Sequence, residues 1–244
     1  MRILIINPNT TASMTAKIKE AAISVSNNET EIIAVNPKDG PASIECYYDE
    51  AFSIPGLLRE IRSQDFGRID GYIIACFDDV GLDAARNITD VPVVGICEAS
   101  VYTARLVAGS CVVITTLPSS VPAIEKTLTR YGSDRFCKRV RSANIPVLGL
   151  EEGESGEDMI REEIKKTLKE DSPESIILGC AGMADLAKRL TEDFNLPVID
   201  GVVAAVKLVE GLLSQGLKTS KILGYALPPK KVYKGCFSDD QPNS

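Results

Sequence analysis

The feature that most constrains the fold is a regular alternation of short apolar runs with segments of helical spacing. In the first part of the chain the apolar runs are RILII, TEIIAVN, DGYIIAC and VPVVGI, and most are followed by a loop and a helical pattern. Short runs that are apolar at nearly every position are typical of parallel strands covered on both faces. The alternation therefore predicts an α/β fold with a mainly parallel sheet flanked by helices.

The same pattern then starts again, which indicates an internal repeat. SCVVITT, SIILGC and LPVID form a second series of expected strands, and EDMIREEIKKTLKE and MADLAKRLTE are among the expected helices. Cys76 lies about as far before Pro92 as Cys180 lies before Pro197. We expect two pseudo-symmetric α/β halves, residues 1–97 with 208–244 and residues 98–207. The polar end of the chain, SDDQPNS, is expected to be a loose tail.

Cys76 and Cys180 end equivalent apolar runs, and ligands of open parallel sheets bind beyond the carboxyl ends of strands. If the two halves face each other, both thiols face one cleft. Opposed thiols can remove a proton from one face of a carbon and return one to the other face, which inverts that carbon. One cysteine must then be a thiolate. Both precede an expected helix start, whose N–H groups are expected to lower the thiol pKa.

A plain packing role is the alternative for every cysteine, because cysteine is often buried as a small apolar side chain. Position alone does not separate this alternative from catalysis for Cys76 and Cys180. Asp78 and Asp79 follow Cys76, and a nearby carboxylate opposes thiolate formation. Helix capping is the preferred interpretation of Asp79. Packing is the preferred interpretation for the remaining cysteines, which are Cys46, Cys97, Cys111, Cys137 and Cys236.

Candidate substrate-binding residues lie next to the same strand ends. They are Asn9, Ser43, Phe77, Thr115, Thr116, Ala181 and Gly182. Turn chemistry explains Asn9, in NPNT, at least as well as binding does. Ser43 either binds substrate or caps a turn. Gly182 allows close backbone approach, and N–H groups near it are suited to hold an enolate oxygen.

The chain contains no histidine. This absence excludes Ser-His-Asp triads, Cys-His dyads and His-ligated metals, so acid–base chemistry must use carboxylate, thiol, lysine, tyrosine or water. There is no GxGxxG or Walker A sequence and no metal-ligand spacing. We therefore expect neither a cofactor nor a metal.

Charge and hydropathy exclude further classes of protein. The 244 residues carry a net charge of −7, and the basic residues are scattered, which argues against nucleic-acid binding. No apolar stretch reaches the length of about 18 residues that a membrane span needs, and no secretory signal is recognisable. Seven cysteines without CxxC spacing are typical of reduced thiols. A cytoplasmic protein without membrane contact is expected.

Several motifs together resemble the hydantoin racemase branch of the aspartate/glutamate racemase superfamily, which includes allantoin racemases. In chain order they are ILIINPNTTASMT, GPASIE, ACFDDVGL, GICEAS, LGCAGM and PVIDGVVAAV. The resemblance covers nearly the whole chain. It implies two α/β halves with the active site between them, cofactor-independent catalysis by Cys76 and Cys180, and a homo-oligomer. Val80 stands where many relatives have proline, which we interpret as a loop detail.

The function that the resemblance implies is racemisation of hydantoin-type cyclic ureides, with allantoin as the expected natural substrate. Amino-acid racemases of the superfamily support their cysteines with polar acid or base groups, often histidine, whereas here alanine follows Cys180. The ring proton of a 5-substituted hydantoin is flanked by a carbonyl and an amide nitrogen and is easier to remove. Amino-acid racemase, maleate isomerase and arylmalonate decarboxylase chemistry stay open as alternatives, as does a non-catalytic ureide-binding protein.

Overall fold

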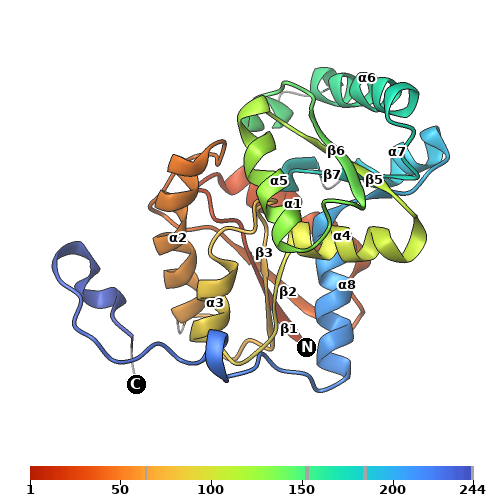
Figure 1. Ribbon diagram of the computed structural model, residues 1–244. Helices are drawn as coiled ribbons and strands as arrows, with labels where there is room; N and C mark the ends of the chain where they lie inside the picture. The colour runs from red at the N-terminus through yellow and green to blue at the C-terminus, as the bar shows by residue number, and fades with distance from the viewer. Residues whose placement is uncertain (64, 152–153, 184–185, 243–244) are drawn as a thin grey trace.

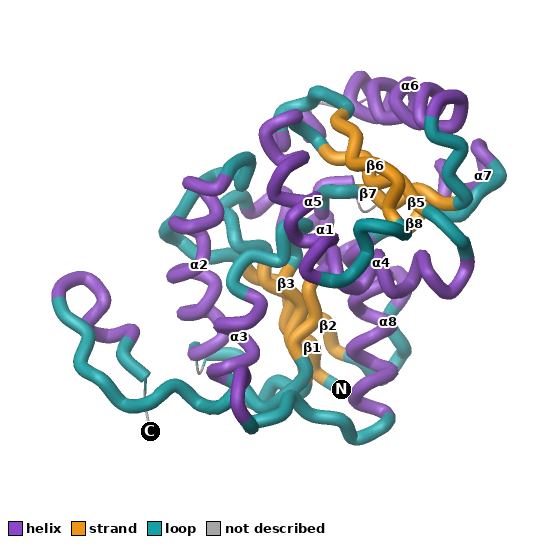
Figure 2. The backbone as a smooth tube through the Cα atoms, in the orientation of Figure 1, coloured by secondary structure: helices purple, strands orange, loops and turns teal. Residues whose placement is uncertain are grey.

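The fold is seen in a computed structural model, which describes residues 1–63, 65–151, 154–183 and 186–242. Two four-stranded parallel sheets, ordered β2-β1-β3-β4 and β6-β5-β7-β8, are flanked by helices (Figures 1 and 2). The two sheets have the same order of equivalent strands. The predicted fold class, two pseudo-symmetric α/β halves with mainly parallel sheets, is confirmed.

The first sheet and its neighbouring helices take up the first part of the chain. The strands are β1 (Arg2–Ile6), β2 (Glu31–Val35), β3 (Gly71–Ile74) and β4 (Val93–Gly95). The helices are α1 (Ala12–Val25), α2 (Tyr47–Arg62), α3 (Leu82–Ile88) and α4 (Ile96–Val107). Strands β1 and β3 are each followed by a turn and a helix, and β4 leads directly into α4, as the alternation of apolar and helical segments predicts.

The second part of the chain repeats this order and ends in an arm. The strands are β5 (Cys111–Thr115), β6 (Cys137–Ser142), β7 (Ser175–Leu178) and β8 (Val198–Ile199). The helices are α5 (Val121–Arg130), α6 (Glu154–Glu170), α7 (Ala187–Phe194) and α8 (Gly201–Ser214). Short 3-10 turns cover Pro118–Ser120, Val147–Glu151, Ala181–Met183, Leu223–Tyr225 and Gly235–Asp240. In the described part of the chain, no helix combines the length and apolar character needed to cross a bilayer.

Strand β6 is the element that the apolar runs did not predict. Its sequence, CKRVRS, buries only Cys137 and Val140, and charged side chains occupy most other positions. The reason is its place at the edge of the second sheet, where it pairs with β5 alone. An edge strand needs fewer apolar positions than a central parallel strand, so a continuous run is absent.

Alternate residues of each central strand face different cores. In β1, Ile3 and Ile5 join a core with side chains of α1, α4 and α8, whereas Leu4 and Ile6 pack with α2 and α3. Both faces are buried because helices cover both sides of the sheet (Figure 1). Two-sided burial explains why these strands are apolar at nearly every position.

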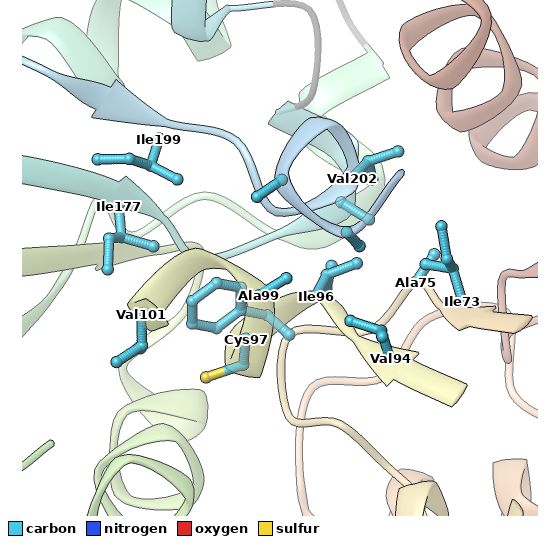
Figure 3. Close-up of a cluster of buried hydrophobic side chains, with 14 of the residues drawn as sticks. Ile73, Ala75, Val94, Ile96, Cys97, Ala99, Val101, Ile177, Ile199 and Val202 are labelled. Atoms are coloured by element: carbon cyan, nitrogen blue, oxygen red, sulfur yellow. The ribbon is translucent and has the colours of Figure 1, made fainter. Parts of the chain in front are cut away.

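A large hydrophobic cluster has members in both halves. Ile73 and Val94 of the first sheet and Ile177 and Ile199 of the second converge on Val202, at the start of α8 (Figure 3). Dense packing across this junction resists relative movement of the sheets and so positions their carboxyl ends. The division into residues 1–97 with 208–244 and residues 98–207 stays a prediction.

The cysteines outside the candidate site divide into two groups. Cys97, Cys111 and Cys137 are buried in the hydrophobic cluster, in agreement with a packing role. The same interpretation is wrong for Cys46 and Cys236, which are exposed. Cys46 is the N-cap residue of α2, and Cys236 lies on the C-terminal arm, so neither side chain reaches a core.

Hydrogen bonds attach the end of the chain to side chains of α2. Beyond α8 the chain forms an extended arm (Figure 1). The Asp240 carboxylate accepts hydrogen bonds from Nε and Nη2 of Arg59, at 2.9 and 2.7 Å, and Arg62 donates to the carbonyl of Gln241 at 3.1 Å. The expectation of a loose tail is therefore wrong up to Gln241, and residues 243–244 lie outside the described residues.

Candidate active site

The two predicted catalytic cysteines lie on equivalent turns of the two halves. Each follows a strand that pairs with the central strand of its sheet, β3 with β1 and β7 with β5. The same pair of backbone hydrogen bonds shapes each turn. These bonds join Ala75 N–H to Ile6 O (2.9 Å), Gly179 N–H to Ile114 O (2.8 Å), Asp79 N–H to Cys76 O (3.0 Å) and Met183 N–H to Cys180 O (3.1 Å). The sequence repeat around the cysteines is thus a structural repeat.

Both cysteines line one cavity at the carboxyl ends of the two sheets. The empty space between the lining residues is about 420 Å³, which includes the part open to solvent. Five of the seven predicted substrate-binding residues also line it, namely Asn9, Phe77, Thr115, Thr116 and Ala181. Ser43 and Gly182 are not among the lining residues. The catalytic and binding roles of all these residues stay predictions.

The environment of Cys180 disfavours its thiolate. Burial raises the pKa of the Cys180 thiol to about 11, and the nearby carboxylates, with Asp78 first among them, contribute to the rise. The backbone N–H of Gly182 opposes this by donating toward the sulfur. The expected N–H group is present, but burial outweighs it.

The environment of Cys76 also disfavours its thiolate. Burial raises its pKa well above the ordinary value, and the Asp78 carboxylate adds to the rise, whereas the Asp78 backbone N–H lowers the pKa. Asp79 and Cys180 also raise it. Backbone N–H groups thus lower the pKa of both thiols, as expected from the helix starts, and the Asp78 carboxylate opposes thiolate formation, also as expected, but burial outweighs the N–H groups.

The NPNT turn is held together by its own side chains. The Asn7 side-chain amide donates to Oδ1 of Asn9 at 2.9 Å and to Oγ1 of Thr15 at 3.1 Å. Oδ1 of Asn9 also accepts the N–H of Thr11 at 2.9 Å, and its Nδ2 lies 3.6 Å from the Met14 sulfur. These contacts are the turn chemistry that the sequence offered as the alternative for Asn9. Asn9 forms part of the cavity wall, where its Oδ1 is held by the turn and its Nδ2 contacts the Met14 sulfur.

Other polar side chains of the cavity are available to a ligand. Within the described ranges, the hydroxyls of Thr116 and Ser120 and the carboxyl of Asp78 have no side-chain hydrogen-bond partner. The Thr115 hydroxyl, by contrast, donates to the Gly179 carbonyl at 3.2 Å. Ser120 was not predicted, although it lies in the turn just after β5, where a search of strand ends would have found it.

Loops from both halves meet over the cavity. Ile44 and Val147 line it, and the Glu45 carboxylate accepts the N–H of Val147 at 2.9 Å. Ser43 lies in the same loop, but its neighbour Ile44 supplies the side chain that faces the cavity. Val147 follows β6 in a segment without a polar or periodic signal, so sequence reasoning missed it.

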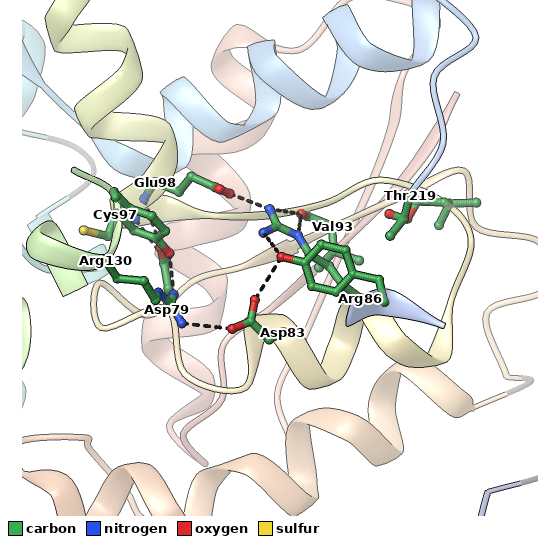
Figure 4. A network of polar contacts seen from close by, with 11 residues as sticks. Asp79, Asp83, Arg86, Val93, Cys97, Glu98, Arg130 and Thr219 are labelled. Atoms are coloured by element: carbon green, nitrogen blue, oxygen red, sulfur yellow. Dashed lines mark hydrogen bonds and ion pairs between the residues drawn. The ribbon is translucent and has the colours of Figure 1, made fainter. Parts of the chain in front are cut away.

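Asp79 ties the Cys76 turn to the rest of the molecule. Its carboxylate accepts the N–H groups of Cys97 (3.1 Å) and Glu98 (2.9 Å) at the start of α4, and the Tyr131 hydroxyl donates to it at 2.6 Å. Figure 4 shows this contact within a polar network that includes Arg86, Asp83 and Arg130. Asp79 therefore caps a helix, as preferred from sequence, but the helix is α4 and not the one that follows it.

Close approach at Gly95 makes this cap possible. A β-carbon at Gly95 would lie 2.6 Å from Oδ2 of Asp79 and nearer still to its other carboxyl atoms. Asp79 has a positive φ of 50°, which is an unfavourable backbone conformation for a residue other than glycine. Burial raises the pKa of Asp79 to about 7, although the Tyr131 hydroxyl and both N–H donors lower it. The cap thus holds a strained residue three positions after Cys76.

Comparison with known proteins agrees with this geometry. The family model described as Asp/Glu/Hydantoin racemase matches residues 3–209. The chain is 50% identical to a hydantoin racemase of Rhizobium meliloti, over 96% of this chain and 98% of that protein. It is also similar to the structure of an allantoin racemase from Klebsiella pneumoniae, with a TM-score of 0.95, 44% identity and 98% of each chain covered.

A second allantoin racemase structure, from Pseudomonas fluorescens, gives a TM-score of 0.92 at 38% identity and covers 96% of this chain and 100% of that one. These findings confirm the predicted enzyme class, an isomerase of the racemase type. The chain belongs to the Asp/Glu/Hydantoin racemase family.

Proposed function

We propose that the protein racemises hydantoin-type cyclic ureides without a cofactor, with allantoin as the natural substrate, and that Cys76 and Cys180 are its catalytic residues. The observation that carries the proposal is the placement of both thiols, on equivalent turns of opposite halves, in the wall of one cavity. The similarity to hydantoin and allantoin racemases supports the same substrate class.

The proposed reaction is a proton transfer on each face of the ring carbon C5. The thiolate of one cysteine takes the C5 proton, and the ring carbonyl becomes an enolate oxygen. The other cysteine then donates its thiol proton to the opposite face, which gives the mirror-image product and leaves a thiolate on that cysteine. Burial raises the pKa of both thiols, so a thiolate forms on either cysteine only against the cost of its burial.

The enolate oxygen needs hydrogen-bond donors while it carries charge. The hydroxyls of Thr116 and Ser120 line the cavity without partners among the described residues, and the Gly182 N–H lies beside the Cys180 sulfur. Donors that are already oriented stabilise the developing charge without reorganisation. These groups are our candidates for the oxyanion site.

The charge of the cavity favours an uncharged substrate. Among the described residues that line it there is no lysine or arginine, and Asp78 is the charged side chain. Aspartate, glutamate, maleate and arylmalonates all carry carboxylates, which are costly to bury without a cationic partner. A neutral cyclic ureide avoids this cost. The cavity therefore supports a ureide substrate over the amino-acid racemase, maleate isomerase and decarboxylase alternatives.

A panel of single-enantiomer substrates tests the proposal. Allantoin, several 5-substituted hydantoins, aspartate and glutamate are each incubated with the enzyme, and loss of optical rotation is followed, with maleate assayed by absorbance. We expect rotation to decay for the ureides alone. Turnover of aspartate, glutamate or maleate without ureide turnover would refute the proposed substrate class. Binding of allantoin with unchanged rotation would show a non-catalytic ureide-binding protein.

A further inference from the structure

Among the described residues that line the cavity, Asp78 carries a carboxyl group that neither the fold nor the proposed proton transfers use. Asp78 lies two residues after Cys76 and lines the cavity. Among the described residues its carboxyl has no hydrogen-bond partner. Helix capping at this turn is carried out by Asp79. A half-buried carboxylate without a partner costs stability, so a structural role does not explain it.

Asp78 also works against the chemistry of the site. Its charge raises the pKa of both Cys76 and Cys180, although the reaction needs a thiolate. Glu50 of α2 adds to this acidic environment: its buried Oε1 has no hydrogen-bond partner among the described residues, and its charge raises the pKa of Asp78. A carboxylate that destabilises the folded protein and opposes thiolate formation needs another role to explain it. In the wall of this cavity, the role left for Asp78 is contact with the substrate.

The polar groups of the cavity are complementary to a ureide. A carboxylate accepts hydrogen bonds and cannot donate them, whereas the hydroxyls of Thr116 and Ser120 can donate. A cyclic ureide carries N–H donors and carbonyl acceptors on one uncharged ring. A substrate with its own carboxylate beside C5 would instead place a like charge near Asp78, with no lysine or arginine among the described lining residues to offset it.

We propose that Asp78 determines substrate specificity: its carboxylate accepts a hydrogen bond from an N–H group of an uncharged ureide and repels ureides whose C5 substituent carries a carboxylate. This inference rests on the proposed function. It explains why the cavity keeps a carboxylate beside two thiols that must ionise. The same carboxylate that provides the selectivity raises the pKa of both thiols.

Two hydantoins of nearly equal shape test the inference, hydantoin-5-acetamide and hydantoin-5-acetic acid, compared by kcat/KM for racemisation at pH 8.5. Two like charges close together at a partly buried site repel enough to change a rate by at least about tenfold. We expect the wild type to prefer the amide by at least that factor. Asp78→Asn keeps the shape and removes the charge, and it should bring the preference within about threefold. Asp78→Ser repeats the test with a second uncharged side chain.

Two controls keep the charge unchanged in the cavity. Asp78→Glu should retain the preference, and Glu125→Gln, which removes an exposed carboxylate on α5, should leave it unaltered. Alkylation of Cys76 and Cys180 by iodoacetamide provides an independent readout, because loss of the Asp78 charge should speed the reaction of these two thiols. If the wild type racemises neither these two hydantoins nor allantoin, the proposed function fails. If it racemises the amide and Asp78→Asn alkylates faster but keeps the wild-type preference, the inference about Asp78 is wrong.

Discussion

Replacement of Gly95 by alanine should release Asp79 from the start of α4. The added β-carbon would overlap the Asp79 carboxyl, because it would stand 2.6 Å from Oδ2. Asp79 must then move away from the N–H groups of Cys97 and Glu98 and from the Tyr131 hydroxyl. A rigid helix start and a strand end surround this position, so relaxation of the backbone offers little relief.

The size of the effect follows from the three hydrogen bonds that the substitution breaks. Hydrogen bonds to a carboxylate are worth about 1.5–3 kcal/mol each, but the released groups recover part of this from water. We therefore expect Gly95→Ala to lower the free energy of unfolding by about 3–5 kcal/mol. For a chain of this length each kcal/mol corresponds to about 2–4 °C, so the melting temperature should fall by roughly 6–20 °C.

Activity should fall as well. The N–H of Asp79 donates to the Cys76 carbonyl at 3.0 Å, so movement of Asp79 moves the Cys76 turn. Misplacement of a reacting group by about 1 Å costs up to about 100-fold in rate. We expect kcat/KM on a hydantoin to drop by one to two orders of magnitude, roughly 10- to 100-fold. Calorimetry and polarimetry on the same preparation measure both effects.

A matched control and a double variant separate this mechanism from a general effect of alanine. Gly211 lies in α8, and a β-carbon there would meet no atom within 4 Å. Gly211→Ala should raise stability by about 0.5–1 kcal/mol and leave activity unchanged. Asp79→Asn combined with Gly95→Ala should cost little more than Gly95→Ala alone, since both act on the same hydrogen bonds. Full additivity, or a Gly95→Ala protein that melts and turns over like the wild type, would refute the reasoning.

Three further predictions concern the thiols and carboxyls. Alkylation of Cys180 in the free enzyme should accelerate steadily up to about pH 10, as peptide mapping by mass spectrometry at each pH would show. A rate that levels off near pH 8.5, the ordinary thiol pKa, would contradict the raised pKa. The folded protein holds the carboxyl protons of Asp78 and Asp79 up to about pH 7, whereas the unfolded chain releases them near 3.8. The free energy of unfolding should thus be lower at pH 8 than at pH 6 by about 1 kcal/mol per carboxyl. The difference between the two pH values should be smaller in Asp79→Asn, and equal stability of the wild type at both pH values would contradict this prediction. Because the proposed proton transfers use only thiols, thiol alkylation should abolish activity and exhaustive chelation should preserve it.

The central strands and the cysteine turns could be predicted because they leave local signals. Strands β1, β3, β5 and β7 are buried on both faces, so their sequences are continuous apolar runs. Ligands of parallel sheets bind beyond the carboxyl ends of the strands, and Cys76 and Cys180 stand at two of these ends. The internal repeat then indicates that the two turns are equivalent.

The remaining parts of the site depend on contacts that no local pattern encodes. The Val147 N–H binds Glu45 across more than 100 residues, and Asp79 meets Tyr131 from the other half. The N–H groups beside the thiols could be predicted because a helix start is visible in sequence, whereas the depth of burial that raises the pKa of both thiols is not. Burial is set by the packing of both halves around the cavity, and here it outweighs the N–H groups.

The most direct test of the two-cysteine mechanism is hydrogen exchange at C5 in heavy water by single-cysteine variants. Serine in place of Cys76 or Cys180 keeps a hydroxyl of similar size that is a far weaker base near neutral pH. Each variant should lose racemisation, because inversion needs a group on both faces. The remaining cysteine should still exchange the C5 proton of the enantiomer that presents it, with retention. After correction for spontaneous exchange, Cys76→Ser should label one enantiomer and Cys180→Ser the other. Labelling of the same enantiomer by both variants, or racemisation by either at near the wild-type rate, would contradict the mechanism.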